Sequence, residues 1–387
     1  MKIYNHDIQK STHETIGGTH LYSGRVLGLS DTTDIVQIHP ALKLEWNSIS
    51  AHYARIGLSH SQNVLWNVSL KSLQTYSDYE PSVYFFGDAV CEHSSYAQLY
   101  RAMDPRWFEI VAFINAKNNF IGLAESLGVS VPATTCFNHT AAVQRLDQWT
   151  YPCYLKPSVS DSGFGIVRCK DSRQLAAALM EWRDSIPFQV QAEVTSSTFI
   201  NLQYQVTDHG MERLLASEQI LHGCAHGGNR YPTLHQPWSL FDPIAEWMAD
   251  QGMKGVFAFD AAVVDGAEQP QYLAIECNPR FNGSSYPTLM AQKLNIEQWS
   301  SETFVTPYRS LADLDLSGLE FSPQSGTGII LINWGTILVG KISVLLAGTT
   351  EQQNELRQRL TTRLMDPQGI SMPVYQTLLS VESAAGL

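Results

Sequence analysis

The segment YLAIECNPRFNGSSYP, residues 272–287, decides the fold of this chain. It begins as an apolar strand and ends in a loop rich in glycine, serine and proline. A carboxylate, an amide and a guanidinium occupy alternate positions within it, as Glu276, Asn278 and Arg280. Because successive side chains of a strand point to opposite faces, these three share one face wherever the strand continues that far.

The preceding apolar segment, GVFAFDAAVV at 255–264, contains one acid, Asp260, and a polar turn joins the two segments. If they pair as strands, Asp260 lies beside Glu276. Magnesium binds carboxylate and amide oxygens and leaves positions for phosphate oxygens, so Asp260, Glu276 and Asn278 are candidate metal ligands. Arg280 adds a planar donor for phosphate or carboxylate. Taken alone, Glu276 and Arg280 could equally form a structural ion pair, with Asp260 capping a turn.

A second candidate site lies in LKPSVSDSGFGIV, residues 155–167. Lys156 stands at the expected end of a strand, and Ser162, Gly163 and Gly165 follow in a loop. Glycines let backbone N–H groups approach a polyphosphate, and the lysine supplies charge. The order differs from a Walker motif, because the lysine precedes the glycines. As a single glycine-rich turn, this segment is equally consistent with an ordinary loop.

Lys117 begins a segment whose apolar residues recur with helical spacing, which predicts a helix ending near Gly128. By itself Lys117 would be interpreted as a solvated surface lysine. The apolar face of this helix consists of Phe120, Leu123, Ala124 and Leu127.

Two further helices are predicted by capping patterns, at Asp171 with Gln174 and at Thr350 with Gln353. Between and around them the sequence predicts short strands, so the element order indicates a mixed α+β fold. The expected strands lie in 64–70, 82–87, 188–194, 201–206, 213–221, 255–264 and 271–278.

Size and composition narrow the class of protein. The 387 residues are too many for one ordinary domain, and the hydrophobic fraction of 44% suits a globular protein with full cores. The formal net charge of −12 and the lack of any Lys/Arg run argue against nucleic-acid binding. A phosphate-binding site in so acidic a chain needs its own local cations.

The stretch 326–348 is long enough to cross a bilayer, but Asn333 and Lys341 interrupt it. We therefore expect two or three buried strands there and no membrane span. The N-terminal segment has no apolar core of a secretory signal, and the six cysteines are scattered. Both observations predict a cytoplasmic protein with reduced thiols.

In this order, the residues above resemble the ATP-grasp superfamily over roughly residues 110–290. Lys117 and Lys156 are similar to the two nucleotide-binding lysines of the family, and VQAEV at 190–194 to the hinge that holds adenine. Asp260, Glu276 and Asn278 match the metal set, and Arg280 matches the arginine after it. Two departures are that the first metal acid is Asp where Glu is more frequent, and that the hinge has few acids. The resemblance implies nucleotide contacts from Lys117, Lys156, Ser162, Gly163, Gly165, Gln191, Glu193 and Asn201.

The resemblance implies a mixed α+β and α/β ATP-grasp fold, in which two lobes clasp ATP. The expected division is an N-terminal pre-ATP-grasp-like domain at 1–112, a small lobe with a glycine-rich lid at 113–190, a metal-binding lobe at 191–305, and C-terminal strands and a helix at 306–387. The first of these carries no motif that matches the family.

The resemblance also implies an ATP-dependent ligase with Mg²⁺, or Mn²⁺ in its place, and Lys156 and Arg280 as catalytic residues. Such an enzyme joins a small-molecule carboxylate to an amine, here amino acids or peptides, and the chain could form a homodimer. An acceptor other than an amine, as in carboxylases, and an inactive nucleotide-binding regulator remain alternatives.

One further loop, HGCAHGGNRYPTLH at 222–235, is expected to lie over the acceptor site. Arg230, His226 and Asn282 are candidate substrate contacts. The H-x-C-x-H sequence fits no common zinc signature, and an ordinary surface loop is the other interpretation.

Overall fold

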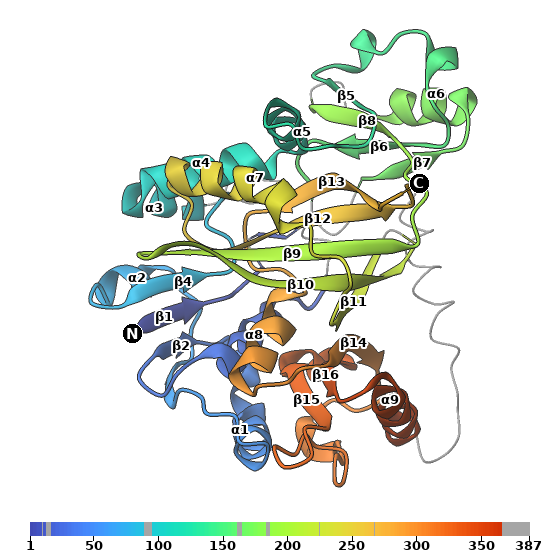
Figure 1. The fold of residues 1–387 in the computed structure, drawn as a ribbon. Coiled ribbons are helices and arrows are strands. Elements are labelled where there is room, and N and C mark those ends of the chain that lie inside the picture. Colours follow the sequence, from blue (N-terminus) through green and yellow to red (C-terminus); the bar gives the residue numbers. More distant parts are fainter. Residues whose placement is uncertain are drawn as a thin grey trace.

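The computed structural model describes residues 1–9, 11–12, 17–88, 95–160, 165–182, 186–223, 225–266 and 268–365. In these ranges the chain forms three β-sheets, of four, eight and four strands, with helices packed against them (Figure 1). Ser162, Gly163, Cys91 and Cys224 lie outside the described residues. The mixed α/β fold agrees with the fold class predicted from sequence.

The N-terminal sheet is parallel, with the strand order β3-β2-β1-β4. Parallel neighbours need crossover connections, and short helices provide them. The strands expected at 64–70 and 82–87 are observed as β3 and β4. Both are shorter and begin earlier than expected, because the aromatic residues that follow each strand belong to loops. The elements are β1 (Lys2–Asn5), η1 (Thr19–Leu29), β2 (Ile35–Gln37), η2 (Pro40–Glu45), α1 (Trp46–Arg55), β3 (Asn63–Leu65), α2 (Lys71–Thr75) and β4 (Glu80–Val83).

Helices α3 (Ser95–Met103), α4 (Pro105–Asn115) and α5 (Lys117–Ser126) connect this domain to the rest. The helix predicted from residue 117 is confirmed as α5. Phe120 and Ala124 are buried, and Gly128 follows with a φ of 73°, a left-handed conformation that favours glycine.

The small lobe is an antiparallel sheet in the order β5-β8-β6-β7, at the top of Figure 1. Asp171 caps its helix by accepting a hydrogen bond of 2.9 Å from the Gln174 backbone, as predicted. Its buried side chains form a core separate from the main one. The elements are β5 (Thr134–Phe137), η3 (Thr140–Ala142), η4 (Leu146–Gln148), β6 (Cys153–Pro157), β7 (Val167–Cys169), α6 (Ser172–Glu181) and β8 (Phe188–Ala192).

The largest sheet has the order β13-β12-β9-β10-β11-β14-β16-β15, so strands from both sides of residue 305 belong to one sheet. The strands expected in 326–348 are confirmed as β15 and β16. No helix in the described part of the chain is long and apolar enough to cross a membrane. The strands are β9 (Thr198–Thr207), β10 (Gly210–His222), β11 (Ala225–Tyr231), β12 (Gly255–Val264), β13 (Gln271–Asn278), β14 (Trp299–Val305), β15 (Gly328–Asn333) and β16 (Lys341–Ala347).

Helices α7 (Trp238–Gln251) and α8 (Ser285–Lys293), with the turns η5 (Leu311–Asp313) and η6 (Trp334–Val339), complete this part. The last helix, α9 (Thr350–Leu364), is capped one residue earlier than predicted. Thr349 and Gln352 form the capping box, because Thr349 has the extended backbone that an N-cap requires.

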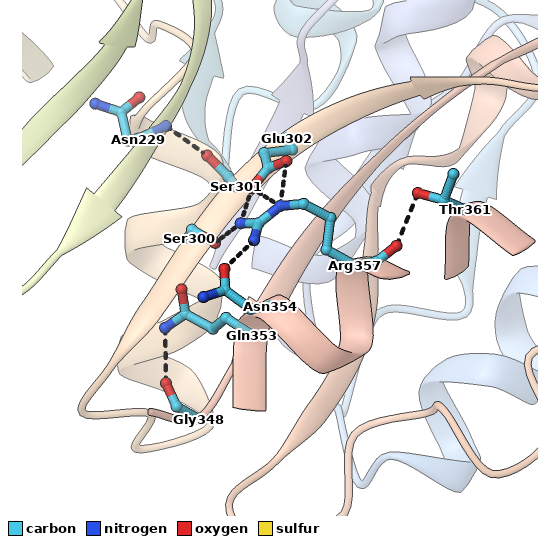
Figure 2. A network of polar contacts seen from close by, with 9 residues as sticks. All are labelled: Asn229, Ser300, Ser301, Glu302, Gly348, Gln353, Asn354, Arg357 and Thr361. Atoms are coloured by element: carbon cyan, nitrogen blue, oxygen red, sulfur yellow. Dashed lines mark hydrogen bonds and ion pairs between the residues drawn. The ribbon is translucent and has the colours of Figure 1, made fainter. Parts of the chain in front are cut away.

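The C-terminal helix is fixed to the large sheet by a charged contact (Figure 2). Arg357 of α9 donates from Nε to both carboxylate oxygens of Glu302 on β14, each at 2.9 Å. Asn354 accepts a further hydrogen bond from Arg357 at 2.6 Å. The negative charge of Glu302 is therefore neutralised from the helix side.

Candidate active site

Strand pairing brings the predicted metal ligands together. Asp260 on β12 lies opposite Glu276 on β13 in one direction and opposite Asn201 on β9 in the other. Asn278 follows two residues after Glu276 and is largely buried. The predicted pairing of Asp260 with Glu276 is confirmed.

The Asp260 carboxylate accepts three hydrogen bonds from side-chain amides. Asn201 Nδ2 and Gln219 Nε2 each donate to Oδ1 at 2.6 Å, and Asn278 Nδ2 donates to Oδ2 at 2.9 Å. Burial, and then the negative charge of Glu276, raise the pKa of Asp260 to about 7 despite these donors. The raised pKa therefore reflects first the burial of Asp260 and then the second carboxylate beside it.

Glu276 has its counter-ion in Lys117, at the start of α5. The distance between Lys117 Nζ and Glu276 Oε2 is 3.2 Å, and Nζ also donates to Ser160 Oγ at 3.1 Å. Burial would raise the pKa of Glu276, but the charges of Lys117 and Lys156 outweigh it and lower that pKa. Lys117 is only 8% exposed. The interpretation as a solvated surface lysine was therefore wrong, because the site's own carboxylate compensates the burial of the ammonium.

The donor set fits a magnesium ion. Two carboxylates and an amide converge, and Asn201 Oδ1, on the amide that contacts Asp260, is buried without a hydrogen-bond partner. Among the described residues no group of three or more His, Cys, Asp or Glu could hold a metal ion. Mg²⁺ also binds amide and phosphate oxygens, so two acids and an amide leave positions for phosphate. Asp260, Glu276 and Asn278 would hold the ion.

Of the predicted nucleotide-binding residues, Lys156 lies on β6, Gln191 on β8 and Glu193 just after β8. Lys156 Nζ donates to Gln191 Oε1 at 2.6 Å. Glu193 accepts from Arg168 Nε at 2.6 Å and from the Tyr154 hydroxyl at 2.9 Å, and Arg168 lowers the pKa of Glu193. The structure thus groups Lys156 with Gln191, and places Glu193 in an ion pair.

Two other predicted nucleotide contacts lie apart from this group. Gly165 is exposed, with a left-handed φ of 76°. Asn201 lies beside Asp260.

Arg280 follows β13 and faces the N-terminal domain. Its backbone N–H donates to Asn278 O at 2.8 Å, which holds the turn after the strand. The guanidinium donates from Nε to the Tyr84 hydroxyl and from Nη1 to Asn115 Oδ1, both at 3.4 Å. Arg280 is therefore held by contacts with three segments of the chain, at Asn278, Tyr84 and Asn115.

A cavity of about 530 Å³ adjoins these residues and is lined by Asp260, Glu276 and Arg280 among others. Of the predicted substrate contacts, His226 and Asn282 line it. Asn282 Nδ2 is buried without a hydrogen-bond partner, so it is free to donate to a ligand.

The His226 ring contacts Asn229 Oδ1 at 2.7 Å, and burial lowers its pKa. Arg230 does not line the cavity, and its Nε donates to Glu218 Oε2 at 2.5 Å. The zinc interpretation of the 222–235 loop depends partly on Cys224, which lies outside the described residues.

Three polar residues of the site were missed in the sequence. Gln219 holds Asp260, and Gln189 is fully buried on the Gln191 face of β8 with both amide atoms unpartnered. Arg25 lines the cavity from the N-terminal domain. A signal was available for Gln189, which stands between the apolar residues Phe188 and Val190 of β8, but not for Gln219, which follows Ser217 and Glu218 in β10.

Comparisons with known proteins define the fold. No family model and no curated protein matches the sequence. The structure is similar to the ADP complex of an N5-carboxyaminoimidazole ribonucleotide synthetase, with a TM-score of 0.59 and 13% identity over 93% of this chain and 95% of that one. The synthetase from Thermus thermophilus gives 0.55 and 13% over 96% and 99%. Biotin carboxylase from Campylobacter jejuni gives 0.56 and 10% over 85% and 84%.

These three proteins align along most of their length with most of this chain. The chain has the fold of the ATP-grasp superfamily, as the sequence motifs predicted.

Proposed function

We propose that this protein is an ATP-dependent, Mg²⁺-requiring ligase. It activates a small-molecule carboxylate as an acyl phosphate and joins it to an amine of an amino-acid-like substrate, with release of ADP and phosphate. The observation that carries the proposal is the convergence of Asp260, Glu276 and Arg280 at one cavity, with Lys117 paired to Glu276. They come from a helix, two strands and a loop, so their meeting is a property of the fold.

The chemistry of phosphoryl transfer suits this arrangement. Catalysis of that reaction is mostly positioning and neutralisation of the charge on the transferred group. Lys117 and Lys156 supply fixed positive charge, and a bound Mg²⁺ would add charge next to Asp260 and Glu276. Because acyl phosphates hydrolyse in water, a lid over the site is useful. The small lobe, with its separate core, is suited to move as such a unit.

The test is a screen of amino acids, peptides and other amines with small carboxylates for release of ADP, with mass spectrometry of the products. We expect ADP release that depends on both a carboxylate and an amine. Lys156→Ala should weaken ATP binding about tenfold, the scale of one charge-assisted contact. Unchanged ATP affinity in this variant would contradict the nucleotide site, and exposed Lys170→Ala in the same lobe is the matched control.

A second candidate is a carboxylase-type reaction, favoured by the names of the similar structures, which include a carboxyaminoimidazole ribonucleotide synthetase and a biotin carboxylase. Bicarbonate would then replace the organic carboxylate. The same screen, run with and without bicarbonate, separates the two reactions. Tight ATP binding without ADP release in any mixture would instead favour an inactive nucleotide-binding regulator.

A further inference from the structure

Arg25 is a buried cation in the cavity whose hydrogen-bonding capacity is not used. Its side chain is 7% exposed, and neither Nε nor Nη2 has a hydrogen-bond partner. No carboxylate of the described residues forms an ion pair with it. Since burial of an unpaired charge is costly, natural proteins keep such groups mainly where a ligand completes them.

The surroundings of Arg25 are aromatic. Its guanidinium carbon lies 4.1 Å from the centroid of the Tyr286 ring, 4.8 Å from that of Tyr84 and 5.1 Å from that of Tyr22. Aromatic faces attract a cation, but they offer no acceptor in the plane of its N–H groups. Burial raises the pKa of Tyr286 and outweighs the lowering effect of the neighbouring Arg25, so the Tyr286 hydroxyl stays neutral and is no counter-ion. The rings therefore hold the guanidinium in place, while Nε and Nη2 along its edge remain without a hydrogen-bond acceptor.

The position of Arg25 is fixed by the residue before it. A Cβ on Gly24 would lie 2.7 Å from Cζ2 of Trp334, so only glycine permits this close approach. Trp334 in turn donates from Nε1 to Gly24 O at 2.8 Å. The contact locks η1 of the N-terminal domain onto η6 and holds Arg25 at the cavity wall.

The unpartnered atoms are the ones that bind carboxylates elsewhere in this chain. Nε and Nη2 lie on one edge of the guanidinium, which forms two parallel hydrogen bonds to a carboxylate or phosphate. Arg55 uses this edge on Glu320, and Arg168 uses it on Glu193, with all four bonds at 2.6 Å. In Arg25 the same edge has no acceptor.

None of the carboxylates that line the cavity in the described part of the chain neutralises the charge of Arg25. Three carboxylates line it, of which Asp260 and Glu276 form the candidate metal site and Glu302 is bound by Arg357. Tyr84 contacts both Arg25, through its ring, and Arg280, through its hydroxyl. Arg25 therefore lies on the part of the wall next to the candidate catalytic arginine.

We propose that Arg25 binds an anionic group of the substrate, a carboxylate or a phosphate, that is distinct from the group that reacts. The assignment of this ligand as a substrate rests on the proposed function, whereas anion binding by Arg25 does not. The substrate class is thus a molecule with two functional ends, one at Arg280 and the metal ligands and one anionic end at Arg25.

The experiment measures binding without turnover. The nucleotide site is saturated with Mg²⁺ and a non-hydrolysable ATP analogue, and the protein is titrated with methyl phosphate or with propionate by calorimetry and thermal shift. We expect one probe to bind the wild type and to raise its Tm, and that probe identifies the anion as phosphate or carboxylate. Arg25→Gln should weaken binding at least about tenfold and abolish the rise in Tm, since both charge and fork are lost.

Two further variants make the result decisive. Arg25→Lys keeps a charge but loses the planar fork, so its affinity should fall between those of the wild type and Arg25→Gln, and it replaces the latter if that variant does not fold. The matched control is Arg101→Gln, because Arg101 also stacks on a ring, 4.4 Å from the Phe108 centroid, but is exposed. It should bind like the wild type. Equal affinity of wild type and Arg25 variants, or no binding of either probe to the wild type, overturns the proposal.

The ADP-release screen distinguishes failure of the proposed ligase function from failure of the anion site at Arg25. Loss of anion binding in Arg25→Gln without any ADP release from the wild type would leave the anion site standing and remove the ligase. ADP release with substrates that carry no anionic group besides the reacting carboxylate, unaffected by Arg25→Gln, would support the ligase and overturn the role of Arg25.

Discussion

Asp260 and Glu276 face each other across the strands β12 and β13, although both are acids, and Lys117 contacts Glu276. Like charges directly opposite on a sheet destabilise it, so a cation is the natural partner for this pair. In the proposed ligase, a divalent ion bound between the two carboxylates would relieve this repulsion.

Glu276→Gln removes one of the two carboxylates and should abolish Mg²⁺-dependent binding of an ATP analogue, as measured by calorimetry. Because Glu276 helps to raise the pKa of Asp260 to about 7, that pKa should also fall in the variant. Carbon-13 NMR titration of Asp260 reads this change without any turnover. Asp315→Asn, an exposed acid paired with Arg363, is the control and should alter neither measurement. A wild-type Mg²⁺ requirement in Glu276→Gln would contradict the metal site.

Lys117→Met should destabilise the protein, whereas the same substitution of an exposed surface lysine would have little effect on stability. The change leaves Glu276 without its nearest counter-ion, and we expect a loss of about 1–3 kcal/mol in the free energy of unfolding, less than for a fully buried pair because Glu276 keeps some solvent contact. Urea unfolding at neutral pH measures it. Lys254→Met, which breaks an exposed ion pair with Asp104, should cost far less. Equal effects of the two substitutions would show that Lys117 is not structurally coupled to the site.

The pairing of β12 with β13 and the shared face of Glu276 and Asn278 could be predicted, because side chains alternate along a strand. The positions of Asp260, Glu276 and Asn278 follow from the period of two, once the two strands are known to pair. The burial of Lys117 could not be predicted, because it depends on Glu276, which lies far along the chain. A single residue's usual exposure says nothing about such a distant partner.

Arg25 was missed for the same reason. Its neighbours Tyr84 and Tyr286 lie far from it in sequence, and the helix η1 shows no periodic pattern or motif. The one local hint was Gly24, whose need for close approach to Trp334 appears only in three dimensions. The capping box of α9 was misplaced by one residue because Thr349 and Thr350 are chemically alike, and only the backbone angles separate them.

Glu320 should make stability depend on pH at the contact between the N-terminal domain and the C-terminal segment. Burial would raise its pKa, but hydrogen bonds from Arg55 and His52 lower it to about 2, from 4.5. The unfolded chain therefore binds the proton first, and the contribution of Glu320 is present above pH 4.5 and is lost as the pH falls toward 2. For His52, burial lowers the pKa and keeps the ring neutral in the folded state. The unfolded chain therefore binds this proton first as well, and stability falls further below about pH 6.5.

Glu320→Gln should thus remove about 1–2 kcal/mol at neutral pH, a figure reduced for the solvent screening of exposed Arg55, and should flatten the dependence below about pH 4.5. Urea unfolding at a series of pH values measures both. Glu355→Gln, from an exposed pair with Arg359 on α9, is the control and should leave the pH profile as in the wild type. An unaltered profile in Glu320→Gln would show that this carboxylate does not link the two segments energetically.

Arg280 should act on the transferred phosphoryl group and the activated carboxylate. It stands two residues after the candidate metal ligand Asn278, just beyond β13, and it lines the same cavity as Asp260 and Glu276. A preorganised donor to developing negative charge is worth roughly 3–4 kcal/mol, or about 10² to 10³ in rate. Arg280→Ala should therefore lose about that much in kcat, with a smaller change in the KM for ATP. The wild type should form one ADP and one phosphate for each bond made, and ³¹P NMR of a complete turnover mixture distinguishes these products. Detection of AMP and pyrophosphate would refute the acyl phosphate and, with it, the role given to Arg280.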